Sequence, residues 1–84
     1  MKQLSDYTYT LKLMVLNRPG VLVRCVQVFS RRGHNIAALQ VIASDNAPDE
    51  SSMTITAFGK PEVMDQIVAQ LTKLVDVISV KEEI

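Results

Sequence analysis

An Asn-x-Pro-Gly turn, residues 17–20, carries the residue types best suited to bind a small molecule. The turn lies between an apolar run that ends at Leu16 and a second run that starts at Val21. If a helix begins with the second run, its first N–H groups have no acceptors inside the helix, and the positive end of the helix dipole lies at the turn. A helix end of this kind attracts carboxylates.

Three residues of the turn suit the recognition of a free amino acid by its backbone atoms. Asn17 offers a donor and acceptors, so it can meet a carboxylate or an ammonium group. Pro19 stiffens the turn, which lowers the ordering cost of binding, and Gly20 has no side chain to hold a ligand away from the backbone. The same residues also make an ordinary entry into a helix, and composition alone favours that interpretation.

The rest of the sequence offers few groups for catalysis or metal binding. His34 is the one histidine, and because it follows Gly33 at a predicted helix end, we expect a turn residue rather than a base. Cys25 lies in an apolar stretch, which favours a buried thiol in a reducing cytoplasm, and no Cys/His cluster has metal-ligand spacing. Arg18 is the only candidate for an acylphosphatase-like anion site, but the glycine-rich loop of such a site is missing. We therefore expect no catalytic and no metal-binding residues, with a small ferredoxin-like hydrolase as the enzymatic alternative.

Charge and hydropathy narrow the class of protein further. The 84 residues contain nine basic and nine acidic side chains, and this neutrality argues against a general nucleic-acid binder. Residues 1–34 hold six of the basic residues and residues 35–84 hold eight of the acidic ones, an asymmetry that could orient a partner. No apolar segment has the length of a membrane span, and the first ten residues do not resemble a secretory signal. We expect a cytoplasmic protein without membrane or nucleic-acid partners.

The hydrophobic periodicity predicts the elements that must position the turn. A period of two in "YTYTLKLMVL" indicates a strand, and the apolar arc after the turn indicates an amphipathic helix that ends at Gly33. A second helix follows Pro61, which suits a first helical turn. The predicted strands are residues 7–16, 35–44, 52–58 and 75–83, with an exposed loop at 45–51.

The predicted order is βαββαβ, which fixes the expected fold class. Two helices with one apolar face each can bury those faces only against a sheet. We expect an α+β fold, the ferredoxin-like sandwich, in which a four-stranded antiparallel sheet carries both helices on one face. A single domain should span residues 1–84, with its core between about residues 7 and 82.

The residues around the turn resemble a known family. The segment "LNRPGVLVRCVQVFSRRGHNIAALQV", residues 16–41, is similar to the first half of an ACT domain, and more closely to the small regulatory subunit of acetolactate synthase, also called acetohydroxyacid synthase. The segments "SSMTIT" (51–56) and "QLTKLVDVISV" (70–80) resemble its third strand and the exit from its second helix. His34 stands where the family usually has an aromatic residue.

The resemblance implies a regulatory chain without catalysis of its own. Such subunits bind the acetolactate synthase catalytic subunit, raise its activity and confer feedback inhibition by valine or another branched-chain amino acid. The resemblance implies no cofactor in this chain, and thiamine diphosphate, magnesium and FAD in the catalytic partner. A stand-alone amino-acid-sensing ACT domain that serves another enzyme is the alternative. Longer family members carry a second domain, so we expect either a short-form subunit or an excised domain.

The resemblance also implies where the ligand binds. ACT domains of this type pair through their sheet edges, and the ligand lies between the first turn of one chain and the start of the second strand of the other. The residues implied on the first chain are Asn17, Gly20, Val21 and Leu22, and those on its neighbour are Asn35 and Ile36. The uncharged segment "AALQVIA" is consistent with a homodimer, because no charge on it discourages edge pairing.

Overall fold

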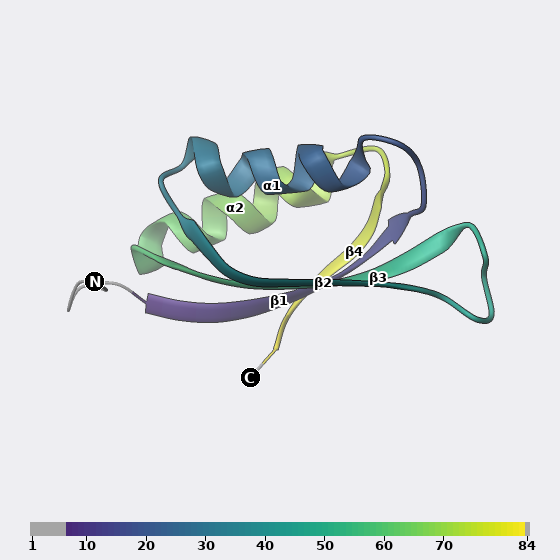
Figure 1. The fold of residues 1–84 in the computed structure, drawn as a ribbon. Helices are drawn as coiled ribbons and strands as arrows, with labels where there is room; N and C mark the ends of the chain where they lie inside the picture. Colours follow the sequence, from purple (N-terminus) through teal and green to yellow (C-terminus); the bar gives the residue numbers. More distant parts are fainter. Residues whose placement is uncertain (1–6, 84) are drawn as a thin grey trace.

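The computed structural model describes residues 7–83 and confirms the predicted order of elements (Figure 1). The strands are β1 (Tyr7–Leu16), β2 (Asn35–Ala43), β3 (Glu50–Gly59) and β4 (Val77–Glu83), and the helices are α1 (Val21–Arg31) and α2 (Pro61–Lys73).

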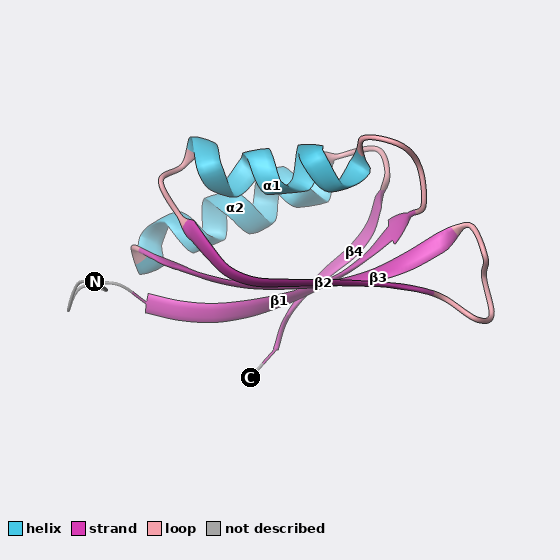
Figure 2. Cartoon of the chain, viewed as in Figure 1, coloured by secondary structure: helices cyan, strands magenta, loops and turns pink. Residues whose placement is uncertain are grey.

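The four strands form one antiparallel sheet in the order β2-β3-β1-β4. Both helices lie on the same side of the sheet, so the molecule has two layers (Figure 2). Since β1 and β3 occupy the centre, β2 and β4 are the edge strands. The ferredoxin-like fold predicted from the sequence is thus confirmed.

The core lies between the two layers. Alternate residues of β1 and β3 point towards the helices, as the period of two predicted, and the helices contribute one apolar face each. Burial of each large apolar side chain stabilises the fold by about 1.5–3 kcal/mol. The buried apolar residues are Tyr9, Leu11, Leu13, Val15, Val21, Cys25, Phe29, Met53, Ile55, Ala57, Ile67 and Leu71.

Burial also determines the chemistry of Cys25. The side chain is fully buried in α1, and this burial raises the pKa of the thiol. A thiol held in its protonated form is a poor nucleophile. The thiol lies in the core, as its apolar surroundings in the sequence predicted.

Two strand starts differ from the sequence prediction by two residues each, because pairing extends or shortens the strands. β3 begins at Glu50, inside the predicted loop, because Glu50 pairs with Leu16. β4 begins at Val77 rather than at residue 75. The register of β1 and β4 shifts between Met14, which pairs with Ser79, and Val15, which pairs with Val77. A bulge of this kind depends on the partner strand, so hydrophobic periodicity does not reveal it.

His34 lies in the turn after α1, as predicted, and its side chain is buried. Its Nδ1 is 2.7 Å from the hydroxyl oxygen of Tyr9, and its Nε2 has no hydrogen-bond partner among residues 7–83. The backbone of Gly59 lies so close to the ring that a Cβ at this position would overlap it. Burial raises the pKa of Tyr9 to about 12, and the nearby Tyr7 contributes in the same direction.

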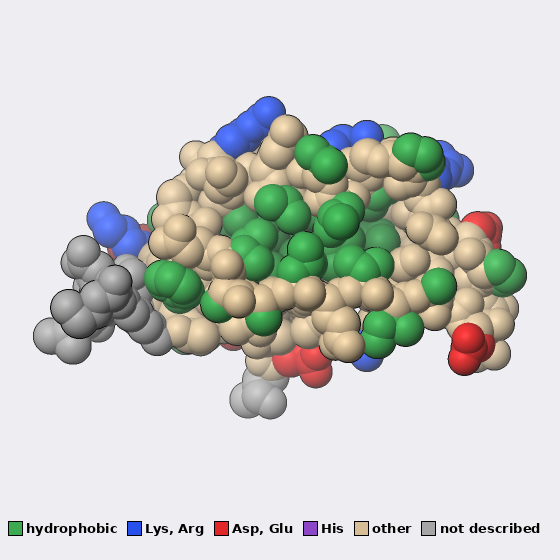
Figure 3. All heavy atoms as spheres, in the orientation of Figure 1, with side chains coloured by type: hydrophobic (Ala, Val, Ile, Leu, Met, Phe, Trp, Pro, Cys, Tyr) green, Lys and Arg blue, Asp and Glu red, His purple; other side chains and the backbone are tan. Residues whose placement is uncertain are grey.

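Edge strand β2 is the most exposed part of the sheet. All of its residues are exposed except Ile36, which is half-buried. Leu39, Val41 and Ile42 keep between 40% and 55% of their surface exposed. In the face seen in Figure 3, hydrophobic side chains gather between the helical layer and this edge. None of the helices in the described part of the chain is long and apolar enough to cross a membrane.

Candidate functional site

Backbone hydrogen bonds fix the Asn-x-Pro-Gly turn on both sides. The Asn17 N–H donates to the Asp49 carbonyl oxygen at 2.7 Å, which ties the turn to the β2–β3 connection. The Arg18 carbonyl oxygen accepts from the Val21 N–H at 3.3 Å and closes the turn. The turn is therefore held against the sheet and is not a free loop.

Helix α1 presents open donors at its start, as the sequence predicted. Gly20 has φ 84°, a left-handed conformation that glycine adopts without strain, and no side chain caps the helix. The N–H of Arg24 donates to the Gly20 carbonyl at 3.0 Å, but within residues 7–83 the N–H groups of Leu22 and Val23 have no acceptor. The two unpaired N–H groups and the positive end of the helix dipole thus lie together at the start of α1.

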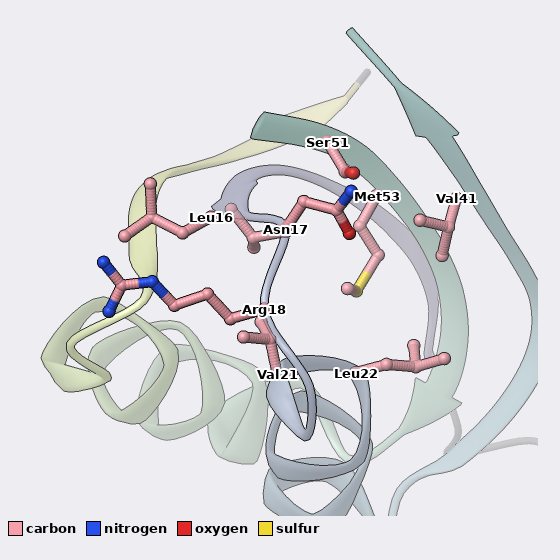
Figure 4. A pocket seen from close by; sticks show the side chains of 9 residues that line it. Leu16, Asn17, Arg18, Val21, Leu22, Val41, Ser51 and Met53 are labelled. Carbon is pink, nitrogen blue, oxygen red and sulfur yellow. The ribbon is translucent and has the colours of Figure 1, made fainter. Parts of the chain in front are cut away.

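A cavity of about 170 Å³ opens beside this helix start. Its walls come from the end of β1, the turn, the first residues of α1, and one face of β2 and β3 (Figure 4). The Asn17 amide points into it, towards Ser51 and Met53, and Leu22 points towards Val41 (Figure 4). The lining residues are Val15, Leu16, Asn17, Arg18, Val21, Leu22, Val41, Ser51 and Met53. The cavity is thus mostly apolar, with polar groups near the turn.

The structure brings together one half of the predicted site. Asn17, Val21 and Leu22 line the cavity, and Gly20 lies in the turn beside it. Asn35 and Ile36 lie elsewhere, at the opposite end of the sheet.

The pairing of β3 shows how far apart the two halves are. Asn35 pairs with Phe58 near one end of β3, whereas Leu16 pairs with Glu50 at the other. Eight strand residues separate these ends, which is roughly 26 Å. One chain therefore cannot bring both groups to the same small ligand.

The sequence did not single out the residues that β2 and β3 contribute. Val41 and Met53 are paired neighbours in the register, and Ser51 is buried beside them. The alternation predicted in both strands was the available signal, since it places these side chains on the helix side of the sheet. Their position relative to the turn depends on the register, which the sequence does not specify.

Arg18 lines the cavity with its stem only. Its guanidinium points away from the cavity (Figure 4), and Nη1 lies 3.4 Å from Oδ1 of Asp76. An acylphosphatase-like site would need this group turned towards a bound anion. Within the described residues, no group of three or more His, Cys, Asp or Glu side chains is arranged to hold a metal ion. The orientation of Arg18 thus does not supply the anion contact that the hydrolase alternative needs.

Comparison with known proteins identifies the family of this chain. Residues 11–79 match the family of AHAS small subunit-like ACT domains, in which AHAS stands for acetohydroxyacid synthase. The chain belongs to this family.

This ACT domain is similar to part of several acetolactate synthase small subunits. The small subunit of Mycobacterium bovis is 42% identical over 80 residues, which are 95% of this chain and 47% of that protein. The isozyme 3 small subunit of Escherichia coli is 44% identical over 72 residues, 86% of this chain and 44% of that one. The crystal structure of the small subunit from Thermotoga maritima has a TM-score of 0.77 and 33% identity, and covers 90% of this chain and 47% of that chain. This ACT domain thus spans about half the length of the curated relatives it matches.

Proposed function

We propose that this ACT domain regulates an acetolactate synthase in branched-chain amino-acid biosynthesis. It binds the catalytic subunit in the cytoplasm, raises its activity and makes it sensitive to valine or a related amino acid. Thiamine diphosphate, magnesium and FAD belong to the catalytic partner. The names of the relatives, which are acetolactate synthase small subunits, support the regulatory role.

The amino acid binds at the start of α1. Its carboxylate accepts hydrogen bonds from the Leu22 and Val23 N–H groups, and the side-chain carbonyl of Asn17 accepts from its ammonium group. Gly20 lets these atoms approach the backbone, and the apolar side chain enters the cavity beside Val21. An apolar cavity with a few polar groups at one end suits an amino acid such as valine.

A second copy of the chain completes the site. β2 is an edge strand with exposed apolar residues, so pairing of two β2 strands covers this surface and satisfies the open edge. In an antiparallel pair related by a two-fold axis, the start of one β2 lies beside the end of the other. The neighbour's Asn35 and Ile36 then approach the cavity near Val41, which lies towards the end of β2. This arrangement accounts for the separation of the two halves within one chain.

The N–H groups of Leu22 and Val23, which are unpaired within residues 7–83, carry this proposal, because they lie at the helix start where Leu22 lines the apolar cavity. A thermal-shift screen of free amino acids tests it, and we expect valine to raise the melting temperature. Gly20→Asp should abolish this rise in melting temperature. A side chain at φ 84° is strained, and the aspartate carboxylate would occupy the place of the ligand carboxylate. Gln27→Asp, which adds the same charge at an exposed position later in α1, should keep the shift.

Mixing experiments separate regulation of acetolactate synthase from regulation of another enzyme. We expect a cognate catalytic subunit to co-elute with the ACT domain and to turn over faster in its presence. A chain that binds valine but neither co-elutes with the catalytic subunit nor changes its rate would instead be an amino-acid sensor for a different enzyme. A chain that also ignores every amino acid would contradict the binding proposal.

A further inference from the structure

Asp76 is a buried acidic residue that the site described above does not use. It lies in the connection between α2 and β4, and only 8% of its surface is exposed. Its Oδ2 accepts a hydrogen bond from Nη2 of Arg24 at 2.6 Å, and its Oδ1 lies 3.4 Å from Nη1 of Arg18. Its carbonyl oxygen accepts the Leu16 N–H at 2.8 Å. Asp76 therefore contacts residues before, within and after the Asn-x-Pro-Gly turn.

Arg24 connects Asp76 to the glycine of the turn. The Arg24 N–H donates to the Gly20 carbonyl at 3.0 Å, so the residue is part of the first turn of α1. Its side chain folds back over Gly20, since a Cβ on Gly20 would lie 3.1 Å from Nη1 of Arg24. The guanidinium therefore lies between the Asp76 carboxylate and the turn, and holds the helix start against the α2–β4 connection.

The two partners of Asp76 differ in strength. The Arg24 contact is short and charge-assisted, whereas the Arg18 contact is long and the Arg18 side chain is 63% exposed. The Asp76 side chain itself is 11% exposed, so loss of Arg24 would leave its charge buried with one weak partner. Arg24 is thus the stronger of the two charged partners of Asp76, and it connects Asp76 to the start of α1.

We infer that Asp76 is a positioning residue for amino-acid binding and acts through Arg24. The inference rests on the proposed function, because it concerns the same turn. The helix start has no side-chain cap, so the Arg24–Asp76 pair replaces a cap as the restraint that keeps the Leu22 and Val23 N–H groups in place. A restrained site loses less entropy when the ligand binds.

The negative charge of Asp76 could also act in a second way, and the two roles predict opposite changes in ligand affinity. If its main effect were to neutralise the two arginines, its removal would leave two free positive charges near the turn. A ligand carboxylate would then bind more tightly. Positioning predicts weaker binding instead.

The test compares Asp76→Asn, Arg24→Gln and Arg24→Lys in the full chain. Arg24→Lys should keep most of the affinity, because the observed contact uses a single nitrogen that an ammonium group can replace. Thr10→Val is the control, since it removes the 2.9 Å Thr10–Thr56 contact on the face of the sheet that carries no helix. Two quantities are measured: the dissociation constant for valine by calorimetry, and the hydrogen-exchange rates of the Asn17 and Arg24 amides without ligand.

Asp76→Asn and Arg24→Gln should each weaken valine binding about tenfold, as the loss of one charge-assisted contact predicts. Both should speed exchange at the two amides, and the double variant should lose no more than either single one. Unchanged or tighter valine binding in Asp76→Asn, or equal losses in Thr10→Val, would overturn the inference.

The exchange measurement separates failure of the inference from failure of the proposed function. If the unaltered chain binds neither valine nor any other amino acid of the screen, the proposed binding function fails. Faster exchange in Asp76→Asn alone would then still support positioning of the turn, and unchanged exchange would overturn it.

Discussion

The hydroxyl oxygen of Tyr9 lies 2.7 Å from Nδ1 of His34, and both side chains are buried. Tyr9 comes from central strand β1, whereas His34 stands between α1 and edge strand β2. This hydrogen bond therefore joins the centre of the sheet to the place where the chain enters its edge. The unpaired Nε2 of His34 makes the Tyr9 hydroxyl the only side-chain partner that the ring has within the described residues.

Tyr9→Phe should lower the free energy of unfolding by about 1–3 kcal/mol, since it leaves both ring nitrogens of a buried histidine without a partner. Its effect should also depend on pH, because burial raises the pKa of Tyr9 from 10 to about 12. The unfolded chain releases the phenolic proton at a lower pH than the folded chain does. The stabilisation is therefore complete below pH 10 and is lost between pH 10 and 12.

Urea unfolding across this range measures both effects. We expect the unaltered protein to lose more stability between about pH 9 and about pH 11 than Tyr9→Phe loses. Equal losses in the two proteins would show that Tyr9 titrates as it does in the unfolded chain.

Gly59→Ala should destabilise the fold by about 1–3 kcal/mol, because the new Cβ overlaps the His34 ring. The backbone of Gly59 does not need glycine for its own conformation, so the cost should come from the ring alone. In His34→Ala the same substitution at residue 59 should cost much less. A double-mutant cycle by thermal unfolding measures this coupling, and additive effects would contradict the contact.

The sequence predicted the elements well because each depends on local periodicity. The bounds of β1 are those of the alternating segment, and both helices begin within a residue or two of Gly20 and Pro61. The polar half of the site was also visible, since Asn17 and Gly20 belong to a recognisable turn.

What the sequence did not reveal depends on contacts between distant residues. Asp76 and Arg24 are 52 residues apart, and nothing near Asp76 in the sequence predicts its burial. The burial of His34 was not predicted, because the sequence does not show that Gly59 leaves room for its ring. The contribution of Val41 and Met53 to the cavity likewise depends on the register of β2 and β3.

Two glycines with positive φ allow a matched test of the turn. Gly20 has φ 84° and Gly33 has φ 74°, so alanine should cost about 1 kcal/mol of strain at either position. A Cβ on Gly33 meets nothing within 4 Å, whereas one on Gly20 would press on the Arg24 guanidinium. Gly20→Ala should therefore destabilise more than Gly33→Ala in thermal unfolding. Equal costs would show that Arg24 is not restrained over the turn.

Leu39→Lys should shift the chain from dimer to monomer. Leu39 is 40% exposed on edge strand β2, and a lysine there places a charge on the apolar surface that two copies are proposed to share. Gln66→Lys, at an exposed position of α2, adds the same charge away from this edge and should leave the dimer intact. Sedimentation equilibrium measures both variants, and a dimer that survives Leu39→Lys would exclude pairing through this edge.

The most direct test of amino-acid binding at this turn is a titration of the ¹⁵N-labelled chain with valine, in which the chemical shifts of the backbone amides are measured. The largest changes should occur at Asn17 and at Leu22 and Val23, whose N–H groups are unpaired within residues 7–83. A second group of changes should appear at Asn35 and Ile36, although these residues lie at the far end of the same chain's sheet. Changes confined to other residues, or no saturable change, would contradict the proposal that this turn binds the amino acid.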